Sequence, residues 1–409
     1  MLHLKYIVAT MNTKFLFFAV ALCMAGFSAQ AKGGKFTVSG RVDGALSGDK
    51  IVLVRFAAHN YSPAPCDAVD TVSLAADGSF SFSGRLDAEC PAKLLYLTSA
   101  QEKPPFPPGI YFALPAGKTV INASAEDFRK GIVGNKLYDK KALAFLAAEE
   151  SLDIALDTIS TRGRRAAQAK DTAAAAALRL QREEVKKAQQ ELYYSFFKED
   201  TPFAAFAYIS TARIYRDDTR GNREVYDNFA PRAKKSGFAA IVKDKCEHAD
   251  SIRVGKPCPE LHLVSRTGQP VRLADYAGKY LLISHWSVAC GGSHYADPLI
   301  AKIYGKYHPY GLEILGTTDP SGVHINFQDP SKAPADMKEY IMNAFKHPYP
   351  DIDLSQGDNY WFERRFDVGG TPYLVFVSPE GVILGVSLGT DALDTVEKTM
   401  EPLAQTLEE

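Results

Sequence analysis

The sequence predicts a multidomain α+β protein with three successive parts. Strand-like stretches in which apolar residues alternate or cluster lie between residues 34 and 130, and long amphipathic helical stretches follow between 135 and 250. From 253 to 409, apolar runs of strand length alternate with helical patterns, which is typical of an α/β domain. The chain has 409 residues, 46% of them hydrophobic, so it can bury more than one core.

Residues 1–31 have the organisation of an export signal. Lys14 precedes an apolar run over 15–26, and the small residues Ala29 and Ala31 form a cleavage site. Cleavage after Ala31 would remove the whole segment, and no later stretch is long and apolar enough to span a membrane, so we expect a mature chain without a transmembrane segment. Lipid attachment at Cys23 is the alternative, although the cleavage site at Ala31 is the better match.

Residues 34–130 are expected to form a small antiparallel β domain. Lys35–Val42, Lys50–Phe56 and Ser79–Gly84 have strand patterns, and Asp77 with Gly78 indicates a turn. Nothing in this part resembles a catalytic constellation. The proline-rich segment 103–109 is predicted to be a stiff loop, with a recognition surface as the alternative.

Residues 135–250 are expected to be helical and to act as a linker or docking region. Two amphipathic stretches, 136–159 and 166–197, surround an expected break at Thr161–Arg165. Thr201 followed by Pro202 is typical of a helix cap with proline at the first helical position.

The α/β part, 253–409, places one cysteine between a strand and a helix. Lys279–Trp286 has the apolar pattern of a strand buried on both faces, and a helical pattern begins by Pro298. Cys290 is therefore expected near the N-terminus of that helix, where unpaired N–H groups and the helix dipole stabilise a thiolate and lower the cysteine pKa. Leu312–Asp319 predicts the next parallel strand.

A helix is expected to follow over Ala335–Phe345. The connection from Pro320 to Ala333 is longer than is usual, and we expect it to form a flap near the cysteine.

These residues resemble the thioredoxin superfamily, and within it the TlpA-like thiol-disulfide oxidoreductases of bacterial envelopes. The sequence keeps Trp286, Cys290 and Pro298 of the family's first motif, and residues 366–385 resemble its second. The resemblance implies a thioredoxin-like fold for 253–409 with a cis peptide bond before Pro372, and 34–130 resembles the β-sandwich module of unassigned role that often precedes it. It also implies a periplasmic protein that acts on protein thiols and disulfides of the envelope, without a cofactor.

The sequence departs from the family at two positions. Ser293 replaces the second cysteine of the motif, and Ala296 stands where an acidic residue is usual. Asp297, one position further, would point about 100° around the helix. A serine cannot resolve a mixed disulfide, but its hydroxyl can donate a hydrogen bond to a thiolate.

The resemblance implies Cys290 as nucleophile, and three outcomes remain open for it. It acts as a monothiol that an external thiol resolves, or Cys258 or Cys246 resolves it, or the domain binds an envelope protein or peptide without turnover. The residues expected to serve the site are the catalytic Cys290, Ser293 and Pro372 and the substrate-binding Trp286, Thr371, Gly291 and Gly292. A further alternative is a structural envelope protein whose other domains do the work.

The remaining cysteines allow two disulfides in an oxidising compartment. Pairing Cys66 with Cys90 and Cys246 with Cys258 would leave Cys290 as the free thiol, whereas the alternative is that some of the four are reduced and buried.

Two other classes of function have little support in the sequence. No metal site is expected, because His285 lies within a strand and only Cys290 and His294 share a helical face. A net charge of −1 gives no sign of nucleic-acid binding.

Overall fold

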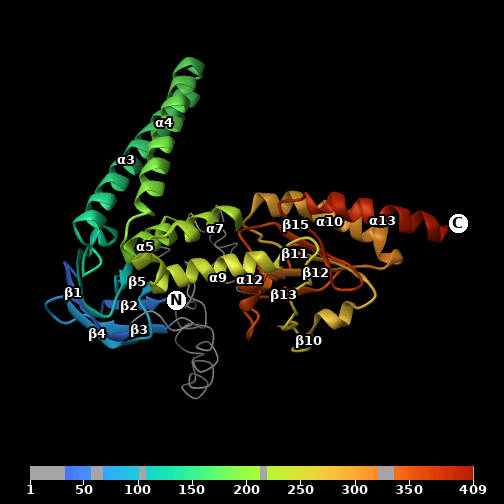
Figure 1. Cartoon of the computed structure of the whole chain (residues 1–409), viewed down its shortest axis with the longest axis horizontal. Helices are drawn as coiled ribbons and strands as arrows, with labels where there is room; N and C mark the ends of the chain where they lie inside the picture. The colour runs from blue at the N-terminus through green and yellow to red at the C-terminus, as the bar shows by residue number, and fades with distance from the viewer. Residues whose placement is uncertain (1–32, 57–67, 101–106, 212–218, 321–335, 409) are drawn as a thin grey trace. The chain divides into compact units, whose positions relative to one another are not determined.

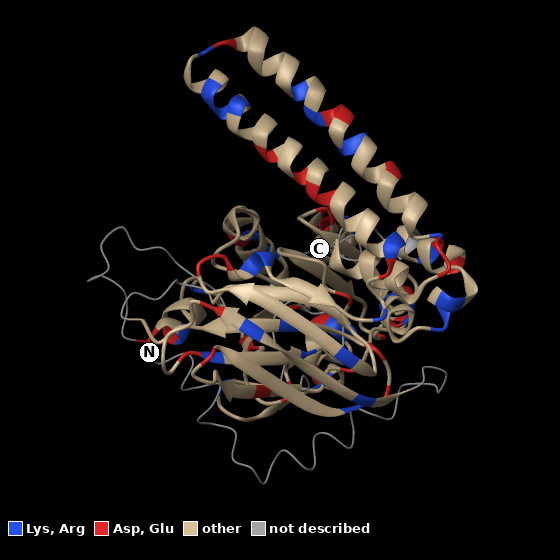
Figure 2. Ribbon diagram, turned by 90° about the vertical axis from the view of Figure 1, so that its left-hand side faces the viewer, with Lys and Arg blue, Asp and Glu red and all other residues tan. Residues whose placement is uncertain are grey.

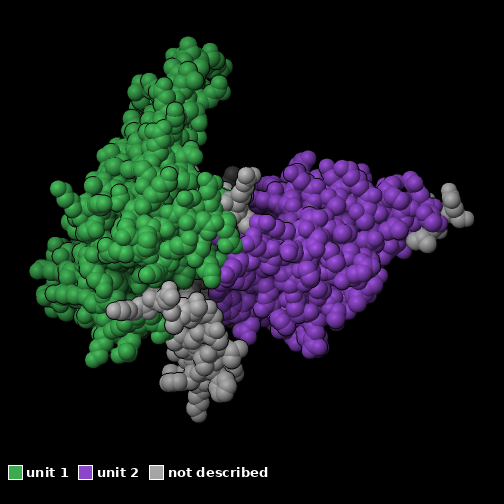
Figure 3. All heavy atoms as spheres, viewed as in Figure 1, with its two compact units in different colours: residues 1–243 green, residues 244–409 purple. Residues whose placement is uncertain are grey.

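A computed structural model describes residues 33–56, 68–100, 107–211, 219–320 and 336–408 of the chain. The chain divides into two compact units, Met1–Lys243 and Asp244–Glu409, and the boundary falls within one helix (Figure 3). Several predictions concern residues outside the described ranges: the export signal with Cys23, Cys66, most of the proline-rich segment and most of the expected flap.

The strands of the first unit form two four-stranded sheets around one core. They are β1 (Gly34–Asp43), β2 (Lys50–Arg55), β3 (Ala68–Ser73), β4 (Ser79–Leu86), β5 (Cys90–Leu97), β6 (Gly109–Leu114), β7 (Gly117–Ser124) and β8 (Ile132–Gly134). The sheet orders are β4-β1-β7-β8 and β3-β2-β5-β6, and only β1 and β7 pair in parallel among these strands. Phe80 and Phe82, alternate residues of β4, are buried in one cluster with residues of both sheets.

One short helix precedes β8 in the chain, and the other helices of this part follow that strand. In chain order they are the short η1 (Phe128–Lys130), then α3 (Lys140–Gln168), α4 (Thr172–Phe196), α5 (Pro202–Ser210), α7 (Thr219–Asn228), α8 (Pro231–Lys234) and α9 (Gly237–Ser251) (Figure 1). The predicted start of α5 is confirmed, because the N–H of Phe203 donates to Thr201 Oγ1 at 3.3 Å and Pro202 is the first helical residue. Within the described ranges, every helix is too short or too polar to cross a lipid bilayer.

The predicted helix break at 161–165 is wrong. Helix α3 continues through it, because one glycine inside a long helix costs only about 1 kcal/mol. The chain turns instead at Lys170, whose φ is 57°, and the side chain of Asp171 caps α4 by accepting from the N–H of Ala174 at 2.9 Å. Figure 2 shows acidic and basic residues along both helices.

The second unit contains a five-stranded sheet of order β13-β12-β11-β14-β15. Its elements are β9 (Leu263–Val264), β10 (Pro270–Val271), η2 (Leu273–Tyr276), β11 (Tyr280–His285), α10 (Gly291–Tyr307), η3 (His308–Tyr310), β12 (Leu312–Thr318), α11 (Met337–Met342), β13 (Asp351–Asp353), α12 (Trp361–Arg365), β14 (Tyr373–Val377), β15 (Ile383–Leu388) and α13 (Ala392–Glu408). The predicted parallel pairing of β11 with β12 is confirmed. Helix α11 is shorter than the predicted helix.

The central strand β11 is buried on both faces, as predicted. Leu281 and Ile283 pack in one hydrophobic cluster of the unit, whereas Leu282 packs in the other, together with Ile300 of α10 and Val396 of α13. Helices α10 and α13 therefore cover the same face of the sheet (Figure 1). The strand is held firmly, so the position where it ends is well defined.

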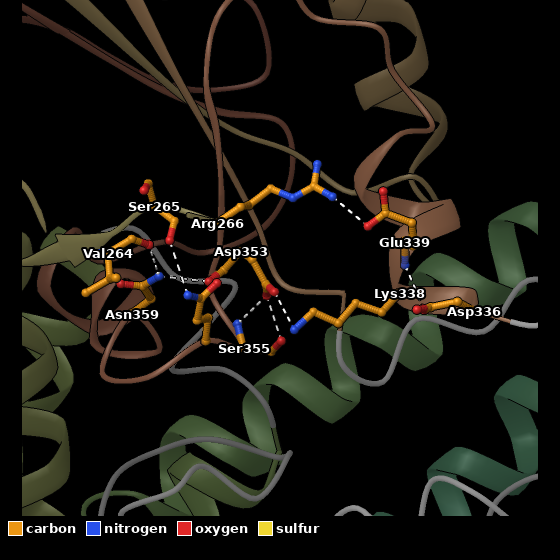
Figure 4. A network of polar contacts seen from close by, with 10 residues as sticks. Val264, Ser265, Arg266, Asp336, Lys338, Glu339, Asp353, Ser355 and Asn359 are labelled. Atoms are coloured by element: carbon orange, nitrogen blue, oxygen red, sulfur yellow. Dashed lines mark hydrogen bonds and ion pairs between the residues drawn. The ribbon is translucent and has the colours of Figure 1, made fainter. Parts of the chain in front are cut away.

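A polar network ties the β9–β10 hairpin and α11 to β13. The Asn359 side chain accepts from the N–H of Val264 at 2.7 Å and donates to the carbonyl oxygens of Val264 and Asp353 at 2.8 and 2.9 Å. Lys338 of α11 forms an ion pair with the buried Asp353 carboxylate (Figure 4). The carboxylate of Asp353 thus holds α11, while its backbone carbonyl holds the hairpin through Asn359.

Candidate active site

The loop between β11 and α10 presents Cys290 at the start of the helix. The N–H of Trp286 donates to the carbonyl of Thr317 in β12 at 2.9 Å, which holds the chain as it leaves the sheet. Cys290 is the residue that precedes the first helical position, and its carbonyl accepts from the N–H groups of Ser293 and His294 at 3.0 and 3.2 Å. The sulfur therefore lies at the positive end of α10, as predicted.

The surroundings of Cys290 favour its thiolate. In the thiol form, Sγ donates to the backbone carbonyl oxygen of Thr371, 3.1 Å away, and this one contact favours the thiol. The pKa of Cys290 is nevertheless lowered by hydrogen bonds with the Thr371 side chain, with the N–H groups of Ser293 and Gly292 and with the Ser293 hydroxyl, which outweigh the opposing effect of burial. A cysteine with these donors is a better nucleophile at neutral pH than an ordinary thiol.

The predicted cis peptide bond between Thr371 and Pro372 is confirmed. The carbonyl of Pro372 accepts from the N–H of Gly389 at 2.8 Å, which fastens this loop to the end of β15. A Cβ atom placed on Gly292 would lie 3.0 Å from Pro372 Cδ and 3.5 Å from Cys290 Sγ. The proline ring and the sulfur thus both lie close to Gly292, whereas a Cβ atom on Gly291 would meet nothing within 4 Å.

Ser293 occupies the position of the missing second cysteine and is 2% exposed. Its Oγ accepts from the N–H of Ser287 at 3.2 Å, so the hydroxyl proton is available to a thiolate. Ser293 and Pro372 line a small cavity.

Beside that cavity lies a cluster that the sequence did not reveal, formed by Asp297, His347 and Asp351 and called here the His347 cluster. His347 Nε2 lies 2.8 Å from Asp297 Oδ1, and its Nδ1 contacts Asp351 Oδ2. Trp286 Nε1 donates to Asp351 Oδ1 at 2.7 Å. Burial alone would lower the pKa of His347, but the two carboxylates outweigh it and raise the pKa above its ordinary value.

Cys258 lies at the other end of the sheet from Cys290. The N–H of Cys258 donates to the carbonyl of Gly381, which lies in the turn after β14. The last residue of β14, Val377, pairs with Leu281 near the start of β11. Cys290 follows the opposite end of β11, and six strand residues span roughly 17 Å between the two ends. Burial also raises the pKa of Cys258 to about 12, so this thiol is neither close to Cys290 nor readily ionised.

The expected disulfide between Cys246 and Cys258 does not form in the structure. Cys258 Sγ instead lies 3.6 Å from the carbonyl oxygen of Pro259, within a hydrophobic cluster. Cys246 is fully buried in α9. This correction agrees with the alternative that both residues serve as small apolar core residues. The proposed partner of Cys90, Cys66, lies outside the described residues.

The two histidines nearest to Cys290 in the sequence have separate environments. Burial lowers the pKa of His285 to about 4, and its Nδ1 lies 3.1 Å from Thr317 Oγ1. His294 Nε2 instead lies 2.8 Å from the carbonyl oxygen of Val288. Among the described residues, no group of three or more histidine, cysteine, aspartate or glutamate side chains is arranged to hold a metal ion.

Comparison with known proteins relates part of the chain to disulfide chemistry. No protein-family model matches the chain. It is 23% identical over 153 residues to the thiol-disulfide oxidoreductase ResA of Geobacillus kaustophilus, a match that covers 37% of this chain and 79% of that protein. ResA of Geobacillus thermodenitrificans is 22% identical over 153 residues, with the same coverage.

Two solved structures are also similar to this chain. The thioredoxin domain of a thiol-disulfide oxidoreductase from Bacteroides vulgatus is 24% identical, with a TM-score of 0.30, over 37% of this chain and 99% of that one. A thiol:disulfide interchange protein from Bacteroides sp. is 25% identical, with a TM-score of 0.30, over 37% of this chain and 92% of that one. About 37% of the chain is thus similar in sequence to a thiol-disulfide oxidoreductase.

Proposed function

We propose that the second unit is a thiol-disulfide oxidoreductase of single-cysteine form, acting on protein disulfides of the periplasm after export of the chain. The observation that carries the proposal is Cys290, which starts α10 with a lowered pKa beside Pro372. Similarity to ResA over 153 residues supports the same chemistry. The small-residue cleavage site at Ala31 supports export.

The reaction begins with attack of the Cys290 thiolate on one sulfur of a substrate disulfide. A mixed disulfide forms and the other substrate sulfur leaves as a thiolate. An external thiol then attacks the mixed disulfide and restores Cys290. Ser293 contains no sulfur, and Cys258 lies at the far end of the sheet, so neither can take that second step.

The neighbouring residues divide the remaining tasks. Ser293 and the first N–H groups of α10 hold the thiolate. Pro372 and Thr371 shape the place where an extended substrate segment lies against the sulfur. Gly292 keeps the space between Cys290 and Pro372 open, and Trp286 supports the loop through its hydrogen bond to Asp351.

The test is the pH dependence of Cys290 alkylation, followed by trapping of mixed disulfides. We expect an apparent pKa below the ~8.5 of a free cysteine, and adducts with glutathione disulfide that mass spectrometry places on Cys290. The C258S variant should behave like the wild type, because its thiol is remote, whereas C290S should form no adduct at this site. An ordinary pKa without any adduct would refute the redox function and favour a binding module.

A further inference from the structure

The mechanism above assigns no role to the His347 cluster, although two of its three side chains are buried next to the active site and the third, Asp297, is 28% exposed. The His347 side chain is 5% exposed and that of Asp351 is 9% exposed. The ring of Tyr349 stacks on the imidazole, with centroids 4.5 Å apart, and the ring of Phe345 lies 5.7 Å away. An imidazole packed this closely is held in one orientation.

Both ring nitrogens of His347 face carboxylates. A neutral imidazole has one nitrogen without a proton, and that nitrogen would face Asp297 or Asp351 lone pair to lone pair. The imidazolium satisfies both contacts, since each N–H then donates to a carboxylate. The geometry therefore keeps the imidazole of His347 protonated, whereas an ordinary histidine loses this proton near neutral pH.

His347 and two neighbours of the reacting sulfur line the same cavity. Its lining includes His347 and Asp297 together with Ser293 and Pro372, which are the neighbours of Cys290. Its volume is about 10 Å³ for the centre of a water molecule, which is the size that holds one water.

A second observation points to the same water. The hydroxyl of Tyr349, which also lines the cavity, is buried and has no hydrogen-bond partner among the described residues. A buried hydroxyl without a partner is costly, and one water in the cavity would satisfy it.

We propose that His347 is the proton donor of this site and protonates, through the cavity, the substrate thiolate that leaves when Cys290 attacks. The proposal rests on the proposed function. His347 does not contact Cys290. It holds the proton in position, and the proton reaches the reacting atoms through the cavity. The groups that face it are Asp297 from α10, Asp351 from β13, Tyr349 before β13, and the Trp286 indole.

The exchange is balanced in atoms and charge. The Cys290 thiolate attacks R–S–S–R′, which forms the Cys290–S–S–R bond, breaks the substrate S–S bond and reduces the R′ sulfur to R′–S⁻. The imidazolium gives its proton to R′–S⁻, which leaves R′–SH and a neutral His347. An external thiol then gives its proton to His347 and attacks the R sulfur, which regenerates both the thiolate and the imidazolium.

The experiment compares two disulfides that differ in leaving group. An aromatic disulfide such as 5,5′-dithiobis(2-nitrobenzoate) releases a thiolate of low pKa that needs no proton, whereas glutathione disulfide releases one of high pKa that does. The H347Q variant of the full chain should react about tenfold more slowly with glutathione disulfide, a modest effect for a general acid. Its rate with the aromatic disulfide should stay within about twofold of the wild type.

Two further variants complete the test. D297N keeps His347 but removes one carboxylate, so the alkaline fall of the glutathione disulfide rate should move to lower pH. H308Q is the matched control, because His308 contacts the carbonyl of Leu312 at 3.1 Å and does not line the cavity. An equal loss with both disulfides, no loss with either, or an unmoved alkaline limb in D297N would overturn the proposal. A wild type that reacts with neither disulfide would instead overturn the proposed function itself.

Discussion

Substitution of Gly292 by alanine tests the packing around the sulfur. The new Cβ atom would lie 3.0 Å from Pro372 Cδ, whereas carbon atoms pack best at about 3.5–4.0 Å. Overpacking of this kind costs about 1–3 kcal/mol. The neighbouring Gly291 is the matched control, because a Cβ atom there meets nothing within 4 Å and both positions lie in the first turn of α10.

The helix-propensity gain of alanine over glycine, up to about 1 kcal/mol, applies to both variants and cancels in their difference. We therefore expect the free energy of unfolding of G292A to lie about 1–3 kcal/mol below that of G291A. The added methyl group, 3.5 Å from Cys290 Sγ, should also slow mixed-disulfide formation. Chemical denaturation and exchange rates measure both effects. Equal stability and equal reactivity of the two variants would refute this account of the site.

Three other changes have defined outcomes. In S293C, the new thiol in the first turn of α10 should resolve the mixed disulfide at Cys290 within the same molecule. Mass spectrometry should then find a disulfide between Cys290 and the introduced cysteine. Two persistent free thiols would contradict this. K245A leaves the buried Asp367 carboxylate unpaired and should lower the free energy of unfolding by about 3–5 kcal/mol in chemical denaturation; a loss below about 1 kcal/mol would count against it. Because its folded-state pKa is raised, His347 stabilises the fold fully below about pH 6.5 and loses that effect as pH rises through the raised value. Denaturation across this window should be steeper in pH for the wild type than for H347Q, and parallel curves would exclude the imidazolium.

The parts of the site that local patterns encode could be predicted from the sequence. The apolar run of β11 requires burial on both faces, and the change of period after Trp286 places Cys290 at the start of α10. The cis peptide bond before Pro372 came from a family resemblance and is confirmed, although no local rule would have predicted it.

The His347 cluster could not be predicted in the same way. Asp297 and His347 are 50 positions apart, and only the fold brings them together. Helix geometry directs Asp297 away from the side on which Ala296 lies. Asp297 is, however, four residues after Ser293, so the two side chains lie on the same face of α10 and line the same cavity. That i,i+4 relation was the available signal. The predicted helix break at 161–165 is absent, because one glycine does not interrupt a helix that has long helical stretches on both sides.

The separation of Cys258 from Cys290 along the sheet determines how the proposed reaction depends on concentration. An internal resolving thiol would make the second half-reaction unimolecular, with a rate independent of any other molecule. With both sulfurs fixed at opposite ends of β11, each half-reaction is instead a collision between two molecules. The lifetime of the covalent adduct is then inversely proportional to the concentration of the resolving thiol. When that thiol is scarce, the mixed disulfide between the protein and its substrate accumulates. The substrate can then be identified by isolating this adduct.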